Sequence, residues 1–375
     1  MSDDQEAGSG SRLRLARQAR GYSQKQLAGM AGVTRQAVSA VEAGLSDPSL
    51  RAALGLARAL GMTVEELFGA FAPTPTVTAT PVAPLGDDGA RVTLAPVGGG
   101  FVAMPLLGPK VTRAGFLPAG GLAERPGAAA SPGVQVRPIG PPRPTLVVAG
   151  CDPALPLLEG PLGLLDPPIT LSWWPCSSRE ALRLAAAGLV HVAGAHLRGT
   201  DGAYNTGPAA ELLPDGGEVI GFCSWREGLV LRPGLAENVS GIGDVARRGL
   251  RLVNRETGAE ARTVLDRELT ELGIVASQLP GYGTEAAGHL EVAAAIAAGL
   301  ADAGIASEPA ALAYGLDVIP LTVEHFDLVI PSAQADSREI QGLLKVLTSR
   351  WLLDQVASLP GYNPARCGEH IAALT

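Results

Sequence analysis

The chain has 375 residues, of which 46% are hydrophobic and 18% charged, and this length and composition predict two or three folded domains. It holds no apolar run of about 18 residues free of charges and of Gly or Pro breaks, and its first residues, MSDDQEAGSGSR, lack the apolar stretch of a secretory signal. A cytoplasmic protein without a membrane span is therefore expected. The four cysteines, Cys151, Cys176, Cys223 and Cys367, have no metal-type spacing, so we expect buried thiols, no metal site and no cofactor.

The net charge of −8 is distributed unevenly. Residues 11–60 contain eight basic and two acidic residues, a net charge of +6, whereas the remainder contains 21 basic and 35 acidic residues, a net charge of −14. A compact basic segment on an acidic chain is the distribution expected when one domain binds nucleic acid and the rest does not.

The predicted elements begin after a disordered N-terminus, residues 1–10, with five short helices over residues 11–70. Ser23 can cap the second of these helices, and Gly32 makes the tight turn to the third. Thr34 can cap the third helix in turn. Two short helices joined by a tight turn are the arrangement of a helix-turn-helix motif.

The exposed start of the third helix carries side chains that suit base recognition. Arg35 can pair bidentately with guanine, and Gln36 with adenine. The start of the preceding helix lies where side chains and backbone amides meet a phosphate. The candidate DNA contacts are Gln24, Lys25, Thr34, Arg35, Gln36 and Ser39. We expect Glu42 to pair with Arg14 or Arg17 rather than with a base; a helical bundle used for protein contact is the alternative interpretation.

This segment resembles the Cro/repressor-type helix-turn-helix, also called the xenobiotic-response-element type. The matching residues include Gly21-Tyr22-Ser23-Gln24, Leu27-Ala28, Ala31-Gly32-Val33, Thr34-Arg35, Val38-Ser39, Glu42-Ala43-Gly44, Leu56-Ala57 and Glu66-Leu67-Phe68. The resemblance implies binding to a double-stranded DNA operator. Because one small module offers little interface, we also expect a homodimer on a pseudo-palindromic site.

Three further regions follow along the chain. Residues 71–89 are rich in Pro and Thr and predict a semi-extended linker. Short alternating segments between Gly-rich turns predict a small β-rich unit over residues 90–142. Apolar strands then alternate with helices over residues 143–375, which favours an α/β fold with parallel sheets in two lobes. The predicted fold class is multidomain: an all-α five-helix domain, a small β-rich middle unit and a bilobal α/β domain.

The last region carries the segments Val148–Ala154, Ser177-Ser178, His191–Leu197, Tyr204-Asn205, Val253–Glu256 and Gly281-Tyr282. This pattern resembles the type II periplasmic-binding-protein fold and, more narrowly, molybdate-binding-protein-like domains fused to helix-turn-helix regulators. The resemblance implies one lobe made of residues 143–235 with 326–375 and another made of 238–325, with a ligand in the cleft between them.

Two predicted helix starts suit an anion in that cleft. Ser177 and Ser178 open a helix after a strand, and Thr257 with Gly258 is expected to open the helix that carries Arg262. The candidate ligand contacts are Asp152, Ser177, Ser178, Tyr204, Asn205, Glu227, Thr257 and Arg262. Each has a structural alternative: the serines as helix caps, Asp152 and the Tyr204-Asn205 pair as turn residues, and Arg262 as a partner of Glu260 or Asp266.

Two classes of effector stay open. The resemblance implies an oxyanion such as molybdate or tungstate. However, Glu260 in the segment Gly258-Ala-Glu-Ala-Arg262 and Glu227 introduce carboxylates where the family's pattern has hydroxyl or amide groups. Unpaired acids disfavour a dianion, so an organic ligand with donors and acceptors, such as a pterin-type molecule, fits comparably.

The sequence as a whole predicts a one-component, sequence-specific DNA-binding transcriptional regulator whose C-terminal domain binds a small effector. One alternative is a regulator whose C-terminal domain serves dimerisation or protein-partner binding without a small ligand. Another is an uncharacterised α/β enzyme, but the chain has no nucleophile elbow, phosphate-binding loop or dinucleotide motif. We therefore expect no catalytic activity.

Overall fold

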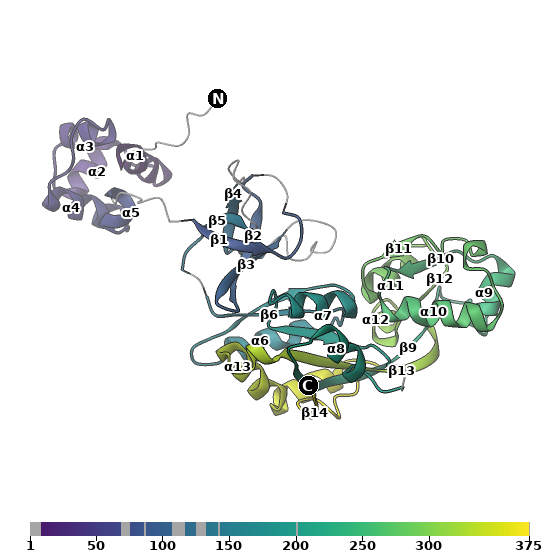
Figure 1. Ribbon diagram of the computed structural model, residues 1–375. Helices are drawn as coiled ribbons and strands as arrows, with labels where there is room; N and C mark the ends of the chain where they lie inside the picture. The colour runs from purple at the N-terminus through teal and green to yellow at the C-terminus, as the bar shows by residue number, and fades with distance from the viewer. Residues whose placement is uncertain are drawn as a thin grey trace. The chain divides into compact units, whose positions relative to one another are not determined.

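The computed structural model describes residues 9–68, 76–85, 88–106, 117–124, 133–141, 143–199 and 202–374, and the chain divides into two compact units, Met1–Pro75 and Thr76–Thr375 (Figure 1). The expected disorder over residues 1–10 lies outside the described residues, except that Ser9 and Gly10 already belong to the first helix. No helix in the described ranges is long and apolar enough to cross a membrane.

The described part of the N-terminal unit consists of five helices, as predicted. They are α1 (Ser9–Ala19), α2 (Gln24–Ala31), α3 (Arg35–Glu42), α4 (Leu50–Leu60) and α5 (Val64–Phe68). Their apolar faces meet in one core that includes Leu13, Leu27, Val38, Leu56 and Leu60. Burial of these side chains provides the stability that such short helices lack in isolation.

Local sequence signals set the ends of α2. The Ser23 hydroxyl accepts a hydrogen bond from the Gln26 amide at 3.2 Å, and the Gln26 side chain accepts one from the Ser23 amide at 2.8 Å, which is the predicted capping box. Gly32 ends the helix at φ 68°, a left-handed conformation that glycine adopts without strain. A Cβ on Gly55 would lie 2.3 Å from the Ala31 carbonyl oxygen, so this glycine lets α4 approach the end of α2.

The strands described between residues 77 and 138 form a closed five-stranded barrel in the order β1-β3-β2-β4-β5. They are β1 (Val77–Pro81), β2 (Arg91–Val97), β3 (Gly100–Pro105), β4 (Gly121–Glu124) and β5 (Val134–Pro138). Strand β1 closes the barrel because it pairs parallel with β3 and antiparallel with β5. The structure thus differs from the expected linker over residues 71–89, because the β-branched run Val77-Thr78 suits a strand despite the nearby prolines; residues 71–75 lie outside the described ranges.

The remaining strands form one nine-stranded sheet in the order β11-β10-β12-β9-β13-β8-β6-β7, with β14 paired to β9. They are β6 (Thr145–Ala149), β7 (Thr170–Trp174), β8 (Val192–Ala195), β9 (Gly217–Leu231), β10 (Leu252–Arg255), β11 (Glu285–Ala286), β12 (Ala303–Ser307), β13 (Asp317–Pro331) and β14 (His370–Leu374). Strands β9 and β13, of 15 residues each, pair antiparallel along their length and run through both lobes.

The expected parallel pairing is confirmed within each lobe, where β6 pairs parallel with β7 and β8, and β10 with β11 and β12. The expectation of separate sheets is wrong, because the antiparallel strands β9 and β13 join the two lobes in one sheet. In the sequence, each long strand looks like two separate apolar segments. The reason is that polar residues interrupt the apolar pattern around Glu227 in β9 and around Glu324 in β13. The backbone nevertheless continues as a strand through these polar residues, because the backbone groups of β9 and β13 hydrogen-bond to each other there.

Helices cover the faces of the sheet in each lobe (Figure 1). The lobe that holds both chain ends of this domain has α6 (Glu159–Gly163), α7 (Ser178–Ala186), α8 (Thr206–Leu212), α13 (Arg338–Leu347) and α14 (Arg350–Ser358). The other lobe has α9 (Ile242–Arg248), α10 (Glu260–Glu271), α11 (His289–Ala297) and α12 (Glu308–Ala313). We call them the first and second lobes.

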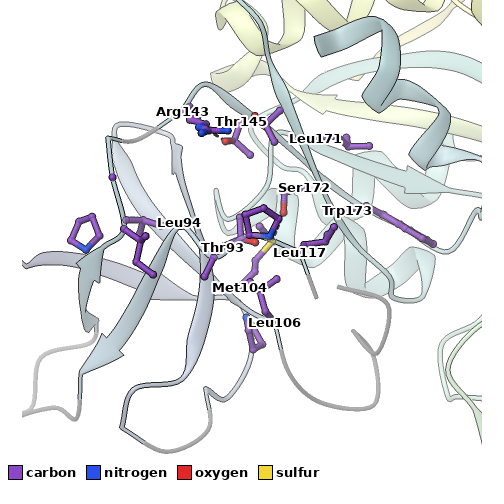
Figure 2. Close-up of a pocket in the computed structure, with 18 of the residues that line it drawn as sticks. Thr93, Leu94, Met104, Leu106, Leu117, Arg143, Thr145, Leu171, Ser172 and Trp173 are labelled. Carbon is purple, nitrogen blue, oxygen red and sulfur yellow. Dashed lines mark hydrogen bonds between the residues drawn. The ribbon is translucent and has the colours of Figure 1, made fainter. Parts of the chain in front are cut away.

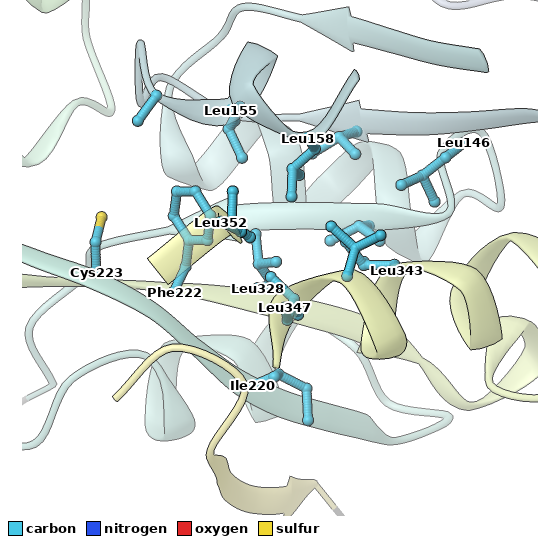
Figure 3. Packing of buried hydrophobic residues seen from close by; sticks show 14 of the residues in the cluster. Leu146, Leu155, Leu158, Ile220, Phe222, Cys223, Leu328, Leu343, Leu347 and Leu352 are labelled. Atoms are coloured by element: carbon cyan, nitrogen blue, oxygen red, sulfur yellow. The ribbon is translucent and has the colours of Figure 1, made fainter. Parts of the chain in front are cut away.

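Each lobe has its own apolar cores on the two faces of the sheet. Figure 3 shows one core of the first lobe, where Phe222 and Leu328 of the long strands pack against Leu343 and Leu347 of α13. The cores of the second lobe lie between the sheet and α9 to α12. The barrel shares a core with the first lobe, since Val97, Met104 and Trp174 belong to one cluster.

Candidate functional site

Helix α3 is fixed by one face and exposes the other. Val38, Val41 and Glu42 are buried in the N-terminal unit. The Thr34 hydroxyl caps the helix by accepting a hydrogen bond from the Ala37 amide at 3.1 Å. The predicted base-contacting side chains at the start of this helix, Thr34, Arg35, Gln36 and Ser39, are all exposed. This is the geometry in which the first turns of a helix can enter a major groove.

Glu42 is the centre of a buried polar network behind α3. Its carboxylate accepts two hydrogen bonds from the Arg17 guanidinium, at 2.6 and 2.9 Å, and its backbone carbonyl accepts one from Arg14 at 3.1 Å. Burial opposes ionisation of Glu42, but the hydrogen bonds from Arg17 and Gln24 and the charge of Arg17 outweigh it and lower its pKa. The predicted structural pairing of Glu42 is confirmed.

The two predicted phosphate contacts on α2 differ in their surroundings. Lys25 is exposed. The Gln24 side chain donates a hydrogen bond to the Glu42 carboxylate at 2.9 Å. Gln24 therefore links the start of α2 to the network behind α3, and only its remaining amide hydrogen and oxygen are available to a phosphate.

The predicted ligand contacts of the first lobe are held by hydrogen bonds within the protein. Asp152 is fully buried and accepts hydrogen bonds from Trp225, Tyr362 and the Ala154 amide. Ser177 caps α7, and the Ser178 hydroxyl accepts a hydrogen bond from the His196 amide at 3.1 Å. Ser177 and Asp152 thus have the structural roles that the sequence left open for them, whereas the Ser178 hydroxyl hydrogen-bonds to the residue after β8 instead of capping the helix.

Tyr204 and Asn205 connect their loop to strand β13. The Tyr204 hydroxyl donates to the Val323 carbonyl at 2.7 Å and lies 3.1 Å from a carboxylate oxygen of Glu324. The Asn205 side chain accepts from the Leu197 amide and donates to Asp327 at 2.7 Å. Asn205 adopts φ 64°, a left-handed conformation that asparagine tolerates better than most residues.

The contacts predicted in the second lobe are arranged differently from the expectation. Helix α10 begins at Glu260, so Thr257 lies in the preceding turn and is exposed. Arg262 pairs with Glu285 and donates to the Arg255 carbonyl at 3.2 Å. The two predicted helix starts do face each other, because a Cβ on Gly258 would lie 3.8 Å from the Ser177 hydroxyl oxygen.

Glu227 differs from all the other predicted contacts. Its side chain is fully buried at the point where β9 passes between the lobes, and neither carboxylate oxygen has a hydrogen-bond partner among the described residues. Two further buried polar atoms without partners lie on neighbouring strands: Nη1 of Arg255 and the hydroxyl of Ser307. Ser307 is the cross-strand partner of Glu227, so both side chains lie on one face of the sheet.

The candidate contacts drawn from the sequence did not include the groups that surround Glu227, since histidines such as His196 and His289 are more often structural than ligand-binding. His196 lies just after β8, and its Nδ1 is 3.2 Å from a carboxylate oxygen of Glu324. His289, at the start of α11, lies with its Nε2 3.8 Å from the Cys151 sulfur. One sequence feature could have indicated them: a polar residue such as Glu324 within a strand whose neighbours are apolar. However, the sequence does not show which residues of β13 lie opposite which residues of β9.

Electrostatics in this cluster, which we call the interlobe cluster (Cys151, His196, Glu227, His289 and Glu324), follow from burial. Burial and the neighbouring carboxylate of Glu324 raise the pKa of Glu227 to about 8. Burial would lower the pKa of His196, but Cys151 and Glu324 raise it well above its ordinary value. Burial, with the charges of Arg255 and His196, lowers the pKa of His289 well below its ordinary value. Neutral His289 accepts a hydrogen bond from the Ser307 amide, so its 3.8 Å contact with Glu227 is not an ion pair.

Two families match the chain, each over one of these regions. A helix-turn-helix family model matches residues 13–67, which contain α2 and α3. An uncharacterized HTH-type transcriptional regulator of Bacillus subtilis, YgzD, is 48% identical over 48 residues, which are 13% of this chain and 73% of that protein. The chain belongs to the helix-turn-helix regulators.

A PBP superfamily domain model matches residues 162–348 of this regulator, a range that includes most of the interlobe cluster. The uncharacterized protein YvgK of Bacillus subtilis is 32% identical over 146 residues, 39% of this chain and 47% of the relative, so the chain spans about half of that protein. A tungstate ABC transporter structure from Geobacter sulfurreducens has 14% identity and a TM-score of 0.44, and the match covers 57% of this chain and 97% of that one.

The regulator also has a pocket of about 460 Å³ where the barrel meets the first lobe. Figure 2 shows Leu94 and Met104 of the barrel, and Leu171 and Trp173 of β7, the strand at the edge of the sheet. Most of its lining is apolar, and the buried polar atoms without partners lie in other parts of the described chain. The pocket therefore offers less specific chemistry than the interlobe cluster.

Proposed function

We propose that this chain is a one-component transcriptional regulator: its N-terminal unit binds a specific operator in double-stranded DNA, and its bilobal domain binds a small effector that changes operator binding. The observation that carries the effector proposal is the fully buried, unpartnered carboxylate of Glu227 at the junction of the two lobes. We place the protein in the cytoplasm, where such an operator is accessible.

The DNA-binding proposal rests on α3. Its buried face leaves Arg35 and Gln36 exposed on the first turn, and these are the side chains whose donors and acceptors match guanine and adenine edges. Exposed Lys25 is suited to a neighbouring phosphate. We further propose that two copies bind together, because a single module of this size buries only part of the surface that a specific protein–DNA complex buries.

The effector proposal rests on the cost of unpartnered polar groups. Each buried polar atom without a hydrogen bond costs about 1–3 kcal/mol, so a ligand that supplies partners to Glu227, Arg255 and Ser307 recovers part of that cost. Positive charge or N–H donors would stabilise the ionised form of Glu227, whose pKa of about 8 favours the neutral form when no partner is present, whereas a dianion placed there would oppose that ionisation. We therefore favour an effector with donor groups, such as a pterin-type molecule, over molybdate or tungstate bound alone.

The test is a thermal-shift and calorimetric screen of the full chain with molybdate, tungstate, sulfate and pterin-type compounds. The proposal predicts a saturable ligand whose affinity falls in Glu227→Gln, which keeps the shape of the side chain and changes its hydrogen bonding. Glu237→Gln, an exposed position in the second lobe, is the matched control and should bind like the wild type. A ligand bound equally well by both variants would place the effector elsewhere.

Operator affinity measured with and without that ligand completes the test. The proposal predicts a changed affinity, since a ligand shifts an equilibrium only by its differential affinity for the two states. We propose that the domain binds its ligand without converting it, so recovery of unchanged ligand is expected. A chemically altered ligand would instead support the enzyme interpretation, and stable dimers with no ligand at all would support a role in dimerisation.

A further inference from the structure

Three residues of the interlobe cluster have the donor atoms of a metal site. They are His196, Glu227 and Glu324, with side chains exposed by no more than 2%. One nitrogen or oxygen of each lies within 4.8 Å of those of the other two. His196 follows β8, whereas Glu227 and Glu324 lie on the two strands that connect the lobes. The three donors thus meet where the lobes join.

The distances fit coordination with small adjustments. Metal bonds of about 2.1 Å to nitrogen and oxygen place tetrahedral ligand atoms roughly 3.4 Å apart. His196 Nδ1 and the nearest oxygen of Glu324 are 3.2 Å apart, which already matches that spacing. The Glu227 oxygen lies within 4.8 Å of the other two donor atoms, so it has to approach by at most about 1.4 Å to reach that spacing. Both its oxygens are available because they have no hydrogen-bond partner in the described part of the chain.

We propose that His196, Glu227 and Glu324 bind a divalent first-row transition-metal ion, with an imidazole nitrogen and two carboxylate oxygens as its protein ligands. This donor set suits Zn²⁺, Co²⁺, Fe²⁺ or Mn²⁺ better than Ca²⁺, which prefers oxygen ligands alone. The ion takes the place of the proton between His196 Nδ1 and Glu324, and it gives Glu227 the partner that the protein does not supply.

The groups around the three ligands would support the ion. The Tyr204 hydroxyl, which donates to the Val323 carbonyl at 2.7 Å, lies 3.1 Å from the second oxygen of Glu324 and would orient that carboxylate when its hydrogen turns toward it. Outer-shell hydrogen bonds of this kind fix the direction of a ligand and strengthen metal binding. Arg255 is close enough to influence Glu227, but its guanidinium makes two hydrogen bonds to Glu256, which offsets its positive charge.

A second set of donors, Cys151, His196 and His289, also lies within 4.8 Å. It requires a free electron pair on His289 Nε2, the nitrogen nearest to Cys151. However, His289 Nδ1 accepts the Ser307 amide at 3.2 Å, so in the neutral ring Nε2 carries the hydrogen. The hydrogen bonds therefore favour the set that contains Glu227 over the set that contains Cys151.

This inference deepens the proposed function and rests on the effector site being at Glu227. The ion would either be the effector itself or hold the two lobes in the arrangement that binds the effector. The test uses tag-free full-length protein, freed of metal with a chelator and then titrated with Zn²⁺ by calorimetry and with Co²⁺ by absorption. We expect one ion per chain and a Co²⁺ spectrum without a sulfur charge-transfer band.

Substitutions identify the ligands. Glu227→Gln and His196→Gln should each weaken binding by more than the roughly 10–100-fold that loss of an outer-shell partner costs. His370→Gln, an exposed control, should bind within about 3-fold of the wild type. Cys151→Ser removes only a neighbour of His196, so it should weaken binding by no more than the roughly 10–100-fold of an outer-shell partner. Circular dichroism and thermal melting of each metal-free variant show whether it is folded, and Glu324→Gln provides a second test if either substitution unfolds the domain.

Several outcomes would overturn the inference: no binding of either ion, full binding by folded Glu227→Gln, or a sulfur band that disappears in Cys151→Ser. Operator affinity with and without Zn²⁺ separates this inference from the proposed function. Metal bound through Glu227 with unchanged operator affinity supports the site and contradicts a metal-effector role. An organic effector that regulates the metal-free protein equally with and without Zn²⁺ supports the proposed function and contradicts the metal site.

Discussion

Replacement of Glu42 by Gln should destabilise the DNA-binding unit more than any surface substitution in it. The Glu42 side chain is 1% exposed and that of Arg17 12%, and two hydrogen bonds join them. Removing one partner of a buried ion pair costs about 3–5 kcal/mol, and the slight exposure of Arg17 favours the lower end of that range. A loss of about 3 kcal/mol raises the population of the opened unit roughly 100-fold, at about 1.4 kcal/mol per factor of ten.

Hydrogen exchange measured by mass spectrometry on the full chain can detect this change. Amides of α2 and α3 that exchange through unfolding of the unit should exchange roughly 100-fold faster in Glu42→Gln, while the barrel and the bilobal domain keep their protection as internal references. Arg14→Gln is the matched control, because Arg14 is 51% exposed and contributes less than about 1 kcal/mol. Less than about 5-fold acceleration in Glu42→Gln, or equal acceleration in Arg14→Gln, would refute the reasoning.

Three further predictions follow from the structure. Because the pKa of Glu42 is lowered, its contribution to the stability of the N-terminal unit is complete above its ordinary pKa of 4.5 and is lost as the pH falls through the lowered pKa. Acid unfolding of this unit should therefore be steeper in the wild type than in Glu42→Gln. Gly281→Ala should cost more than about 2 kcal/mol in the bilobal domain, because a Cβ there lies 2.1 Å from the Leu252 carbonyl oxygen and φ is +84°; a melt unchanged from the wild type would contradict this. Sedimentation should find a homodimer on a pseudo-palindromic operator, with affinity that falls steeply as salt rises, and a monomer on DNA would exclude this arrangement.

The helical unit was predictable because its signals are local. Ser23, Gly32 and Thr34 each set a helix end through contacts within a few residues, and all three act as the sequence indicated. The Glu42 network was predictable as well, since a carboxylate on the buried side of α3 requires a partner and the arginines of α1 are the nearest cations along the chain.

The bilobal domain and its site were less predictable because they depend on long-range register. β13 pairs with β9 about a hundred residues earlier in the chain, and the pairing brings Glu324 opposite Trp225 rather than into a surface turn. The β-rich unit over residues 90–142 was predicted, but its closure into a barrel was not: β1 pairs with β3 and β5, and no local turn signal links Val77 to either. Glu227 was identified through a resemblance, but its isolation from hydrogen-bond partners emerged only from the packing of both lobes.

The central claim, that this regulator reads a DNA sequence through α3, is tested most directly by selecting a binding site from a random DNA pool with the full chain. Wild type, Arg35→Ala, Gln36→Ala and Met30→Ala, an exposed control in α2, are then titrated on that site and on scrambled DNA. The account predicts that Arg35→Ala and Gln36→Ala each lose about 1–3 kcal/mol on the selected site and little on scrambled DNA, with relaxed preference at one base position. Equal losses on both DNAs, or no enriched site for the wild type, would contradict it.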